Sequence, residues 1–204
     1  MWTPTDLHEF LRTRRSLRRF KPMAIDQDVL DRILETATYA PSAHNRQPWR
    51  FAVLTTPQPK IRLSEFLSVD FRSDLAADGL DPDEIESRLN RSITRIQNAP
   101  VLIVLAMDTS EMDVYPDEKR ANAERVMAVQ STAAAGLQLM LAAHAEGLRS
   151  VWTCGPLFSP HTVRTALDLP EYWEPQAMFF IGYSDEKLKP KVLKPLKNVI
   201  LRIG

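Results

Sequence analysis

Four arginines and a serine crowd the segment RRSLRRF (14–20), at the point where the pattern of apolar residues predicts that an opening helix ends. The planar guanidinium group can donate paired hydrogen bonds to phosphate oxygens, and a serine hydroxyl adds another donor. Arg14, Arg15, Ser16 and Arg18 are therefore candidates for binding a phosphate group. A basic cluster at the C-terminal end of a helix also interacts favourably with the helix dipole, so this alternative stays open.

A second polar segment, APSAHNRQPWRF (40–51), contains two prolines and leads into a predicted strand. Such a loop can hold its side chains in place with little entropy left to lose. Ser42, Asn45 and Gln47 offer the donors and acceptors that the edge of a flat heterocycle requires, and His44 is a candidate for contacting a substrate. For any one of these residues a capped turn is the alternative, and Trp49 is expected in the core.

The stretch GLRSVWTCGP (147–156) predicts a strand that ends in a corner of small residues, Thr153, Cys154 and Gly155. Small residues with free backbone N–H groups allow a ring system to lie close to the chain. Cys154 would need a lowered pKa to act as a nucleophile, and no His/Asp arrangement in the sequence supports this. We therefore expect backbone contacts rather than cysteine catalysis here.

The basic tail KLKPKVLKPLKNV (187–199) offers further lysines for a phosphate, although an extended segment with solvated lysines fits it too. The formal net charge is zero and there is one cysteine, which fits a cytoplasmic protein without disulfides. Zero net charge and the lack of interleaved aromatic residues argue against nucleic-acid binding through RRSLRR. The four histidines are scattered, so no metal site is expected.

Residues 1–204 read as a single α+β domain without linkers or repeats. Apolar spacing and capping residues predict helices near 3–13, 26–40, 59–67, 81–98 and 118–146, and a short one after Ser159-Pro160. Strands are expected at 50–56, 101–107, 150–153, 177–183 and in the final NVILRI, and a mobile loop at 68–80. In the longest helix the expected core stripe is Val126, Val129, Ala133, Leu137, Met140 and Leu141. The small residues of STAAAG (131–136) should let another helix approach closely.

The order and spacing of these segments resemble the nitroreductase superfamily over nearly the whole chain. The resemblance rests on RRSLR (14–18), APSAHNRQPW (40–49), GLRSVW (147–152) and LKPLKNV (193–199). It implies a central mixed sheet flanked by helices, and an intertwined homodimer with two FMN molecules at the subunit interface. It also implies a tail that extends over the partner and NADH or NADPH as electron donor.

Residue roles follow from the same resemblance. Arg14, Arg15, Ser16 and Arg18 would hold the phosphate and the N1–C2 edge of the flavin, and Lys191 and Lys194 would close over the phosphate. Pro41, Ser42 and Asn45 would come from the opposite subunit, and Gln47 would contact the ring or the ribityl chain. Thr153, Cys154 and Gly155 would approach flavin N5 and O4 through backbone groups. No protein side chain need act as acid or base, because a bound water can deliver protons.

Within the superfamily, ALDLPEYWEPQAMFFIGYSDE (166–186) resembles the C-terminal domain of the bifunctional protein FbiB, which acts in deazaflavin coenzyme biosynthesis. Three functions are therefore considered. The first is a nicotinamide-dependent reductase of nitroaromatics, quinones or enones, and the second is a reductase of a dehydro precursor in deazaflavin biosynthesis. The third is a flavoprotein that sequesters or consumes FMN.

Overall fold

The computed structural model describes residues 2–188 and 190–203. Its helices are α1 (Pro4–Thr13), α2 (Gln27–Ala37), α3 (Pro57–Ala77), α4 (Pro82–Asn98), α5 (Glu118–Ala145) and α6 (Pro160–Leu167). Its strands are β1 (Trp49–Leu54), β2 (Val101–Asp108), β3 (Arg149–Thr153) and β4 (Trp173–Gly182). Short 3-10 turns are η1 (Ala43–Asn45), η2 (Gly155–Leu157) and η3 (Leu196–Asn198). Except in α3, the helix positions agree with the sequence-based prediction.

The sheet has the order β1-β2-β4-β3, and each neighbouring pair of strands is antiparallel. A mixed sheet was expected. In the described part of the chain, the parallel pairing is a single bridge between Ser16 and Ser150, which lies outside the named strands. This bridge fixes the segment after α1 against the edge strand β3.

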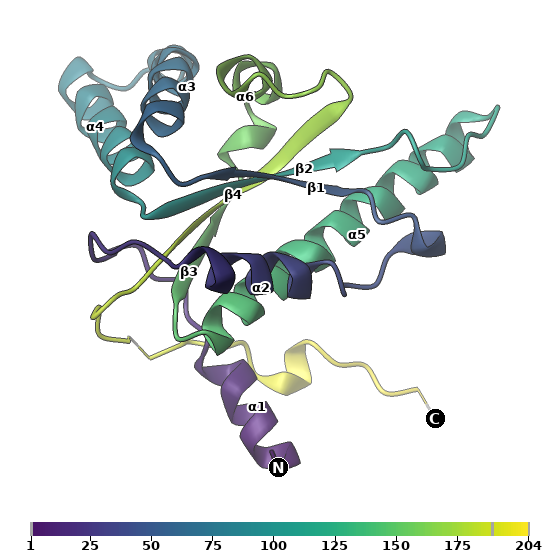
Figure 1. The fold of residues 1–204 in the computed structure, drawn as a ribbon. Coiled ribbons are helices and arrows are strands. Elements are labelled where there is room, and N and C mark those ends of the chain that lie inside the picture. The colour runs from purple at the N-terminus through teal and green to yellow at the C-terminus, as the bar shows by residue number, and fades with distance from the viewer. Residues whose placement is uncertain (1, 189, 204) are drawn as a thin grey trace.

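Helices cover both faces of the sheet. α2 and α5 lie on one face, and α3, α4 and α6 lie on the other (Figure 1). A hydrophobic core lies on each face of the sheet. Alternate residues of β2 pack into one core or the other, because successive side chains of a strand point to opposite faces. Ile103 and Leu105 pack with α2 and α5, whereas Leu102 and Val104 pack with α3, α4 and α6. Both faces of β2 are buried, which explains its unbroken apolar sequence.

The prediction of a mobile loop at 68–80 was wrong, because α3 continues as a helix to Ala77. Leu63, Leu67, Phe71 and Leu75 recur every four residues and place one apolar edge of α3 against neighbouring elements. The charged residues between them occupy the exposed face. That apolar repeat was the available signal for the longer helix.

The predicted core stripe of α5 was also largely wrong. Val126, Val129 and Leu137 are 53%, 37% and 52% exposed, whereas Met140 is buried as expected. The face that meets the sheet carries mainly small residues, among them Gly136, because the helix lies very close to the strands. STAAAG therefore packs closely on the sheet, and α5 also packs against a second helix, α2, as predicted.

By length and composition, α5 is the one helix among the described residues that could cross a membrane. Half of the most apolar stretch of α5 is buried inside the protein. A core helix that packs on a sheet has the same properties, so this is weak evidence for a membrane span.

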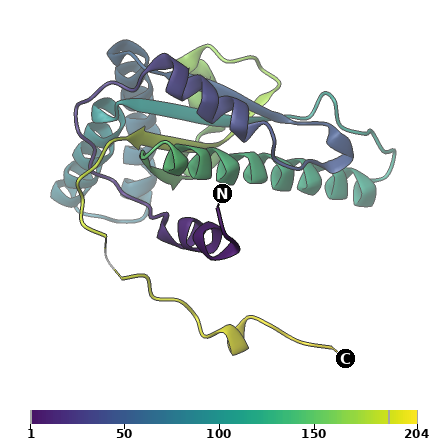
Figure 2. The same ribbon diagram turned by 60° about the horizontal axis from the view of Figure 1, so that its bottom comes forward.

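The C-terminal segment extends away from the body of the protein (Figure 2). The predicted final strand at 198–203 is not formed, and the segment contains only the short turn η3. Val192, Leu201 and Ile203 are 95%, 84% and 89% exposed. An apolar tail that its own chain does not cover is typical of a segment that packs on another molecule.

Candidate functional site

The basic segment that follows α1 is anchored on the edge of the sheet. The backbone N–H of Leu17 donates to the carbonyl oxygen of Ser150 at 3.2 Å, and the Leu17 side chain is buried. Ser16 pairs with Ser150 at the same point. Arg14 and Arg15 precede this anchor and Arg18 follows it, so their backbone positions are fixed by β3.

Two guanidinium groups of this segment have buried atoms without partners. Nη1 of Arg14 and Nε of Arg15 make no hydrogen bond to any described residue. Burial, together with the neighbouring charge of Arg15, lowers the pKa of Arg14. A buried donor without a partner is costly, and a buried charge more so. An anion bound here would satisfy these donors and offset the charge.

His144 lies beside this pair and is held in its neutral form. Its Nε2 is 3.0 Å from Oγ1 of Thr13, and its Nδ1 is 3.2 Å from Nη1 of Arg149. Because Arg149 can only donate, Nδ1 must accept and Nε2 carries the proton. Burial, then the charge of Arg149, and to a smaller extent Arg14, lower the pKa of His144. The region is therefore electropositive without needing a charged histidine.

This arrangement predicts a pH dependence of stability. The folded-state pKa of His144 lies below its ordinary value of 6.5. Between these two pKa values the unfolded chain binds more protons than the folded chain. The free energy of unfolding therefore falls as the pH drops below 6.5. Urea unfolding of the FMN-free protein at several pH values should show this loss, and His144→Gln should reduce it. The exposed His161→Gln is the control, and an unchanged pH slope in His144→Gln would contradict the assignment.

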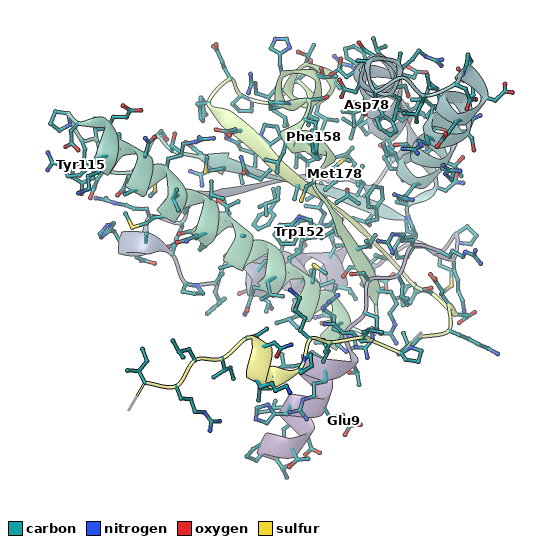
Figure 3. The ribbon with its side chains drawn as sticks, turned by 180° about the vertical axis from the view of Figure 1, so that it is seen from behind. Glu9, Asp78, Tyr115, Trp152, Phe158 and Met178 are labelled. Atoms are coloured by element: carbon teal, nitrogen blue, oxygen red, sulfur yellow. The ribbon has the colours of Figure 1, made fainter. Side chains whose placement is uncertain are left out.

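The small-residue corner opens onto a cavity of about 710 Å³ between the sheet and helices α3 and α4. Thr153 and Gly155 line it, and Cys154 is exposed beside it. Figure 3 shows Phe158 and Met178 together with Asp78 on the α3 side of the molecule. The side chain of Cys154 is a free thiol. Its Sγ accepts a hydrogen bond from Nε1 of Trp152 at 3.2 Å.

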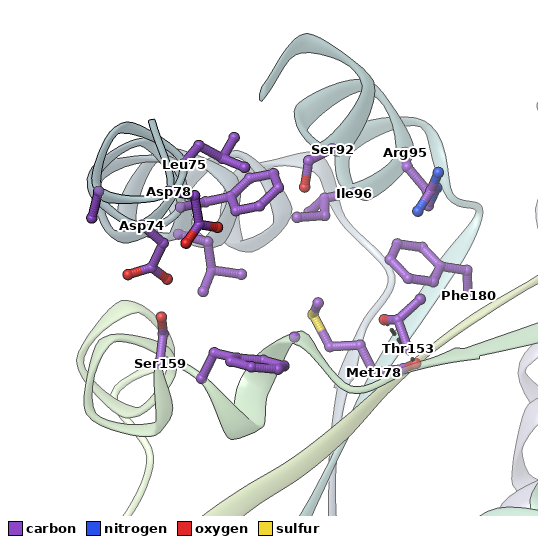
Figure 4. Close-up of a pocket in the computed structure, with 15 residues that line it drawn as sticks. Asp74, Leu75, Asp78, Ser92, Arg95, Ile96, Thr153, Ser159, Met178 and Phe180 are labelled. Atoms are coloured by element: carbon purple, nitrogen blue, oxygen red, sulfur yellow. Dashed lines mark hydrogen bonds between the residues drawn. The ribbon is translucent and has the colours of Figure 1, made fainter. Parts of the chain in front are cut away.

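The cavity has opposite charges at its two ends (Figure 4). Asp74 and Asp78 reach it from α3, and Arg95 lies near Thr153 at the other end. Burial lowers the pKa of Arg95, and so do the charges of Arg18 and Arg91. Arg95 also lines a second depression that contains Arg18. It therefore connects the predicted corner to the predicted basic segment.

Arg95 was not among the candidates taken from the sequence. The signal was present, because Arg88, Arg91 and Arg95 are three and four residues apart and so share one side of α4. Only the fold shows that this side meets Arg18.

The proline-containing loop is held by its own polar side chains. Oγ of Ser42 accepts from the backbone N–H of Gln47 at 3.1 Å, and Oδ1 of Asn45 accepts from the Gln47 side chain at 3.1 Å. His44, Asn45 and Gln47 have positive φ angles of 51°, 54° and 51°. Non-glycine residues rarely adopt this conformation, so the loop has a defined and strained shape. Trp49 is buried, as expected.

This loop and the basic segment are far apart within one protomer. The N–H of Ala43 donates to Oγ of Ser131 at 3.0 Å, whereas Thr13, which directly precedes the basic segment, contacts α5 at His144. Thirteen residues of helix separate these contacts, a distance of about 20 Å. Pro41, Ser42, Asn45 and Gln47 therefore cannot join Arg14 around one small ligand unless they belong to a second copy of the chain.

The distance along β3 suits an elongated ligand. Ser150 beside the basic segment and Thr153 at the corner are three residues apart, or about 10 Å in a strand. The edge strand thus connects a cationic end to a small-residue end. Lys191 and Lys194 lie in the exposed tail, and the structure does not bring them to this site.

Residues 11–183 match the family model described as the nitroreductase family. The chain is 30% identical to an NADH dehydrogenase of Thermus thermophilus, with 92% of this chain and 91% of that protein covered. It is also 30% identical to a 5,6-dimethylbenzimidazole synthase of Rhodospirillum rubrum, covering 85% and 80% of the two chains. A crystal structure from Desulfovibrio desulfuricans, in complex with FMN, aligns with a TM-score of 0.74 and 24% identity over 100% and 99% of the chains.

Proposed function

From the premise that the chain belongs to the nitroreductase family, we propose that it is an FMN-dependent oxidoreductase acting on a small acceptor. The electron donor is NADH or NADPH, and the acceptor is a nitroaromatic, a quinone or an enone. A homodimer in the cytoplasm is the working form, without nucleic-acid or membrane partners. The relatives named for NADH dehydrogenase activity and for bound FMN support this assignment.

The buried donors of Arg14 and Arg15 are the observation that carries the proposal. They need an anion, and the edge strand leads from them to a corner that accepts a flat ring. FMN has a phosphate at one end and an isoalloxazine ring at the other. These residues therefore fit the cofactor at both ends.

Each part of the site then has a role. Arg14, Arg15 and Ser16 hold the phosphate, while Arg18 and Arg95 place positive charge near the pyrimidine edge of the ring. FMN, when bound, supplies the electron-transfer chemistry, and the protein supplies orientation and electrostatics. Positive charge at that edge favours reduction, because negative charge develops there. The cavity beyond Thr153 and Gly155 admits the donor and then the acceptor, with Phe71 and Phe158 offering aromatic surface.

A dimer completes the site in this proposal. Along α5, the loop with Ser42 and Asn45 lies about 20 Å from the point where Thr13, next to the arginines, contacts the helix, and this distance supports a site in which the partner supplies the loop. Val126, Val129 and Leu137 leave an exposed apolar strip on α5, and the tail is apolar and uncovered. Such surfaces are suited to an intertwined interface. Lys191 and Lys194 would then reach the partner's phosphate site.

The test of this function uses purified protein. Its absorbance spectrum, FMN titration and oligomeric state are measured first, followed by anaerobic mixing with NADH or NADPH. We expect a yellow dimer that is bleached by the nicotinamide and regains colour with a quinone or nitroaromatic acceptor. Colourless, monomeric protein that does not take up added FMN would overturn the proposal.

The same measurements separate the alternatives. Bleaching by a reduced deazaflavin but not by a nicotinamide would favour the reductase of deazaflavin biosynthesis. The sequence identity to a dimethylbenzimidazole synthase favours the third function, a flavoprotein that consumes FMN. The product named for that relative contains the same dimethyl-substituted benzene ring as the flavin. In that case reduced FMN would be consumed when oxygen is admitted as the oxidant, and its absorbance would not return.

Removal of the tail tests the dimer. Truncation after Glu186 should yield monomers that bind FMN more than tenfold more weakly, because one interface and two lysines are lost together. Light scattering after gel filtration and FMN titration measure these effects. The double variant Lys191→Ala/Lys194→Ala should stay dimeric and lose only FMN affinity. A truncated protein that remains a dimer with normal FMN affinity would exclude this role of the tail.

A further inference from the structure

Three groups capable of binding a metal meet at the outer end of α5. They are His44 in η1, Asp113 in the loop after β2, and Glu124 in the second turn of α5. One ligand atom from each lies within 4.8 Å of the others. This cluster is separate from the basic segment and from the 710 Å³ cavity.

Glu124 is the unusual member of the cluster. Glu124 is only 3% exposed. Its Oε1 accepts the backbone N–H of Asp113 at 3.3 Å, while its buried Oε2 has no hydrogen-bond partner within residues 2–188 and 190–203. A buried carboxylate with a free oxygen is unfavourable unless it gains a proton or a cation.

The nearby arginine does not fill this role. Nη2 of Arg46 pairs with Oδ1 of Asp113 at 2.5 Å, and among the described residues Arg46 makes no ion pair or hydrogen bond with Glu124. The pair neutralises Asp113 but leaves the buried Oε2 of Glu124 without a partner among the described residues. Arg46 also orients the Asp113 carboxylate without belonging to the cluster. Metal-binding carboxylates are commonly hydrogen-bonded to such a neighbouring residue.

We propose that His44, Asp113 and Glu124 bind one divalent transition-metal ion, Zn²⁺ or Mn²⁺. An imidazole nitrogen and two carboxylate oxygens form a donor set that suits these ions. With bonds of about 2.0–2.2 Å, ligand atoms in a tetrahedral site lie roughly 3.4 Å apart. The ligand atoms reach this spacing by a contraction of at most about 1.4 Å per pair, and the exposed His44 can move toward the two carboxylates. Water completes the coordination.

The ion joins the loop at 41–47 to the start of α5. Ser42 and Asn45 belong to this loop, so the metal also steadies residues assigned to the flavin of the partner subunit. The metal site itself lies within one protomer and does not depend on the proposed function. Metal binding can therefore be measured whether or not the protein takes up FMN.

The experiment uses the full-length protein, treated with EDTA and dialysed, then titrated with ZnCl₂ or MnCl₂ by calorimetry. Thermal unfolding is followed in parallel. We expect one ion per chain and a higher Tm. Glu124→Gln should weaken binding more than tenfold, because even loss of an outer partner typically costs about 10–100-fold. Without metal, Glu124→Gln should be at least as stable as the wild type, since a buried carboxylate with an unpartnered oxygen is removed.

His44→Ala provides a second test at an exposed position and should also weaken binding more than tenfold. His161→Ala is the matched control and should bind metal like the wild type. Failure of the wild-type protein to bind an ion stoichiometrically would overturn the proposal, as would normal binding by both variants. If Glu124 instead pairs with the partner subunit, the wild type will not bind metal and Glu124→Gln will weaken the dimer, which also overturns it.

Discussion

Arg14→Ala is expected to weaken FMN binding by about 10–100-fold, while the FMN-free protein stays as stable as the wild type or becomes more stable. A hydrogen bond to a charged group contributes about 1.5–3 kcal/mol, and each 1.4 kcal/mol is a factor of ten. The two effects have opposite signs for a physical reason. Without an anion, Nη1 of Arg14 is buried without a partner among the described residues, so its removal relieves a cost. With FMN bound, the same group is a favourable contact.

FMN titration and urea unfolding of the FMN-free protein measure the two effects separately. Arg12→Ala is the matched control, because Arg12 lies in the last turn of α1 but is exposed. It should bind FMN nearly as well as the wild type. Arg14→Lys should recover only part of the affinity, since an ammonium group lacks the planar fork of a guanidinium. Full FMN affinity in Arg14→Ala at equal stability would rule out a phosphate role for Arg14.

Much of the fold could be predicted because local signals and tertiary packing agree. Thr3 and Asp6 form a capping box at α1, and β2 is apolar on both faces because both are covered. The sequence-based predictions failed where the size of side chains, or the lack of a neighbouring strand, determines the structure. In α5 the small face meets the sheet, so bulky residues such as Val126 and Leu137 remain exposed. The apolar tail resembles a strand, but its own chain offers it no strand to pair with.

The site was predictable in its parts but not in its assembly. Arginine clusters and proline-framed loops carry chemistry that residue types reveal. Sequence spacing, however, did not show that the loop with Ser42 and the segment with Arg14 would lie about 20 Å apart along one helix. Nor did it show that Arg95 faces Arg18 across two elements. Such relations are set by long-range packing, which the local sequence does not contain.

Gly136→Ala is expected to destabilise the protein by about 1–3 kcal/mol, the usual cost of overpacking a core. A Cβ at this position would lie 2.8 Å from Cζ of Phe179, 2.9 Å from Cζ3 of Trp152 and 3.1 Å from Cδ2 of Leu105. All three side chains would have to give way, and protein cores are closely packed. In an exposed helix the same change would stabilise by about 1 kcal/mol, because alanine is the better helix former. Here packing outweighs propensity.

Urea unfolding measures the effect, and Ala123→Gly at an exposed position of α5 gives the propensity contribution in the same helix. A double-mutant cycle identifies the cause. Phe179→Leu removes the nearest ring atom, so the combined variant should be more stable than the sum of the single effects predicts. Trp152 also donates to Sγ of Cys154, so a displaced indole should disturb the corner and weaken FMN binding. If Gly136→Ala is neutral or stabilising, α5 does not lie this close to the sheet, and the explanation for its exposed bulky residues fails with it.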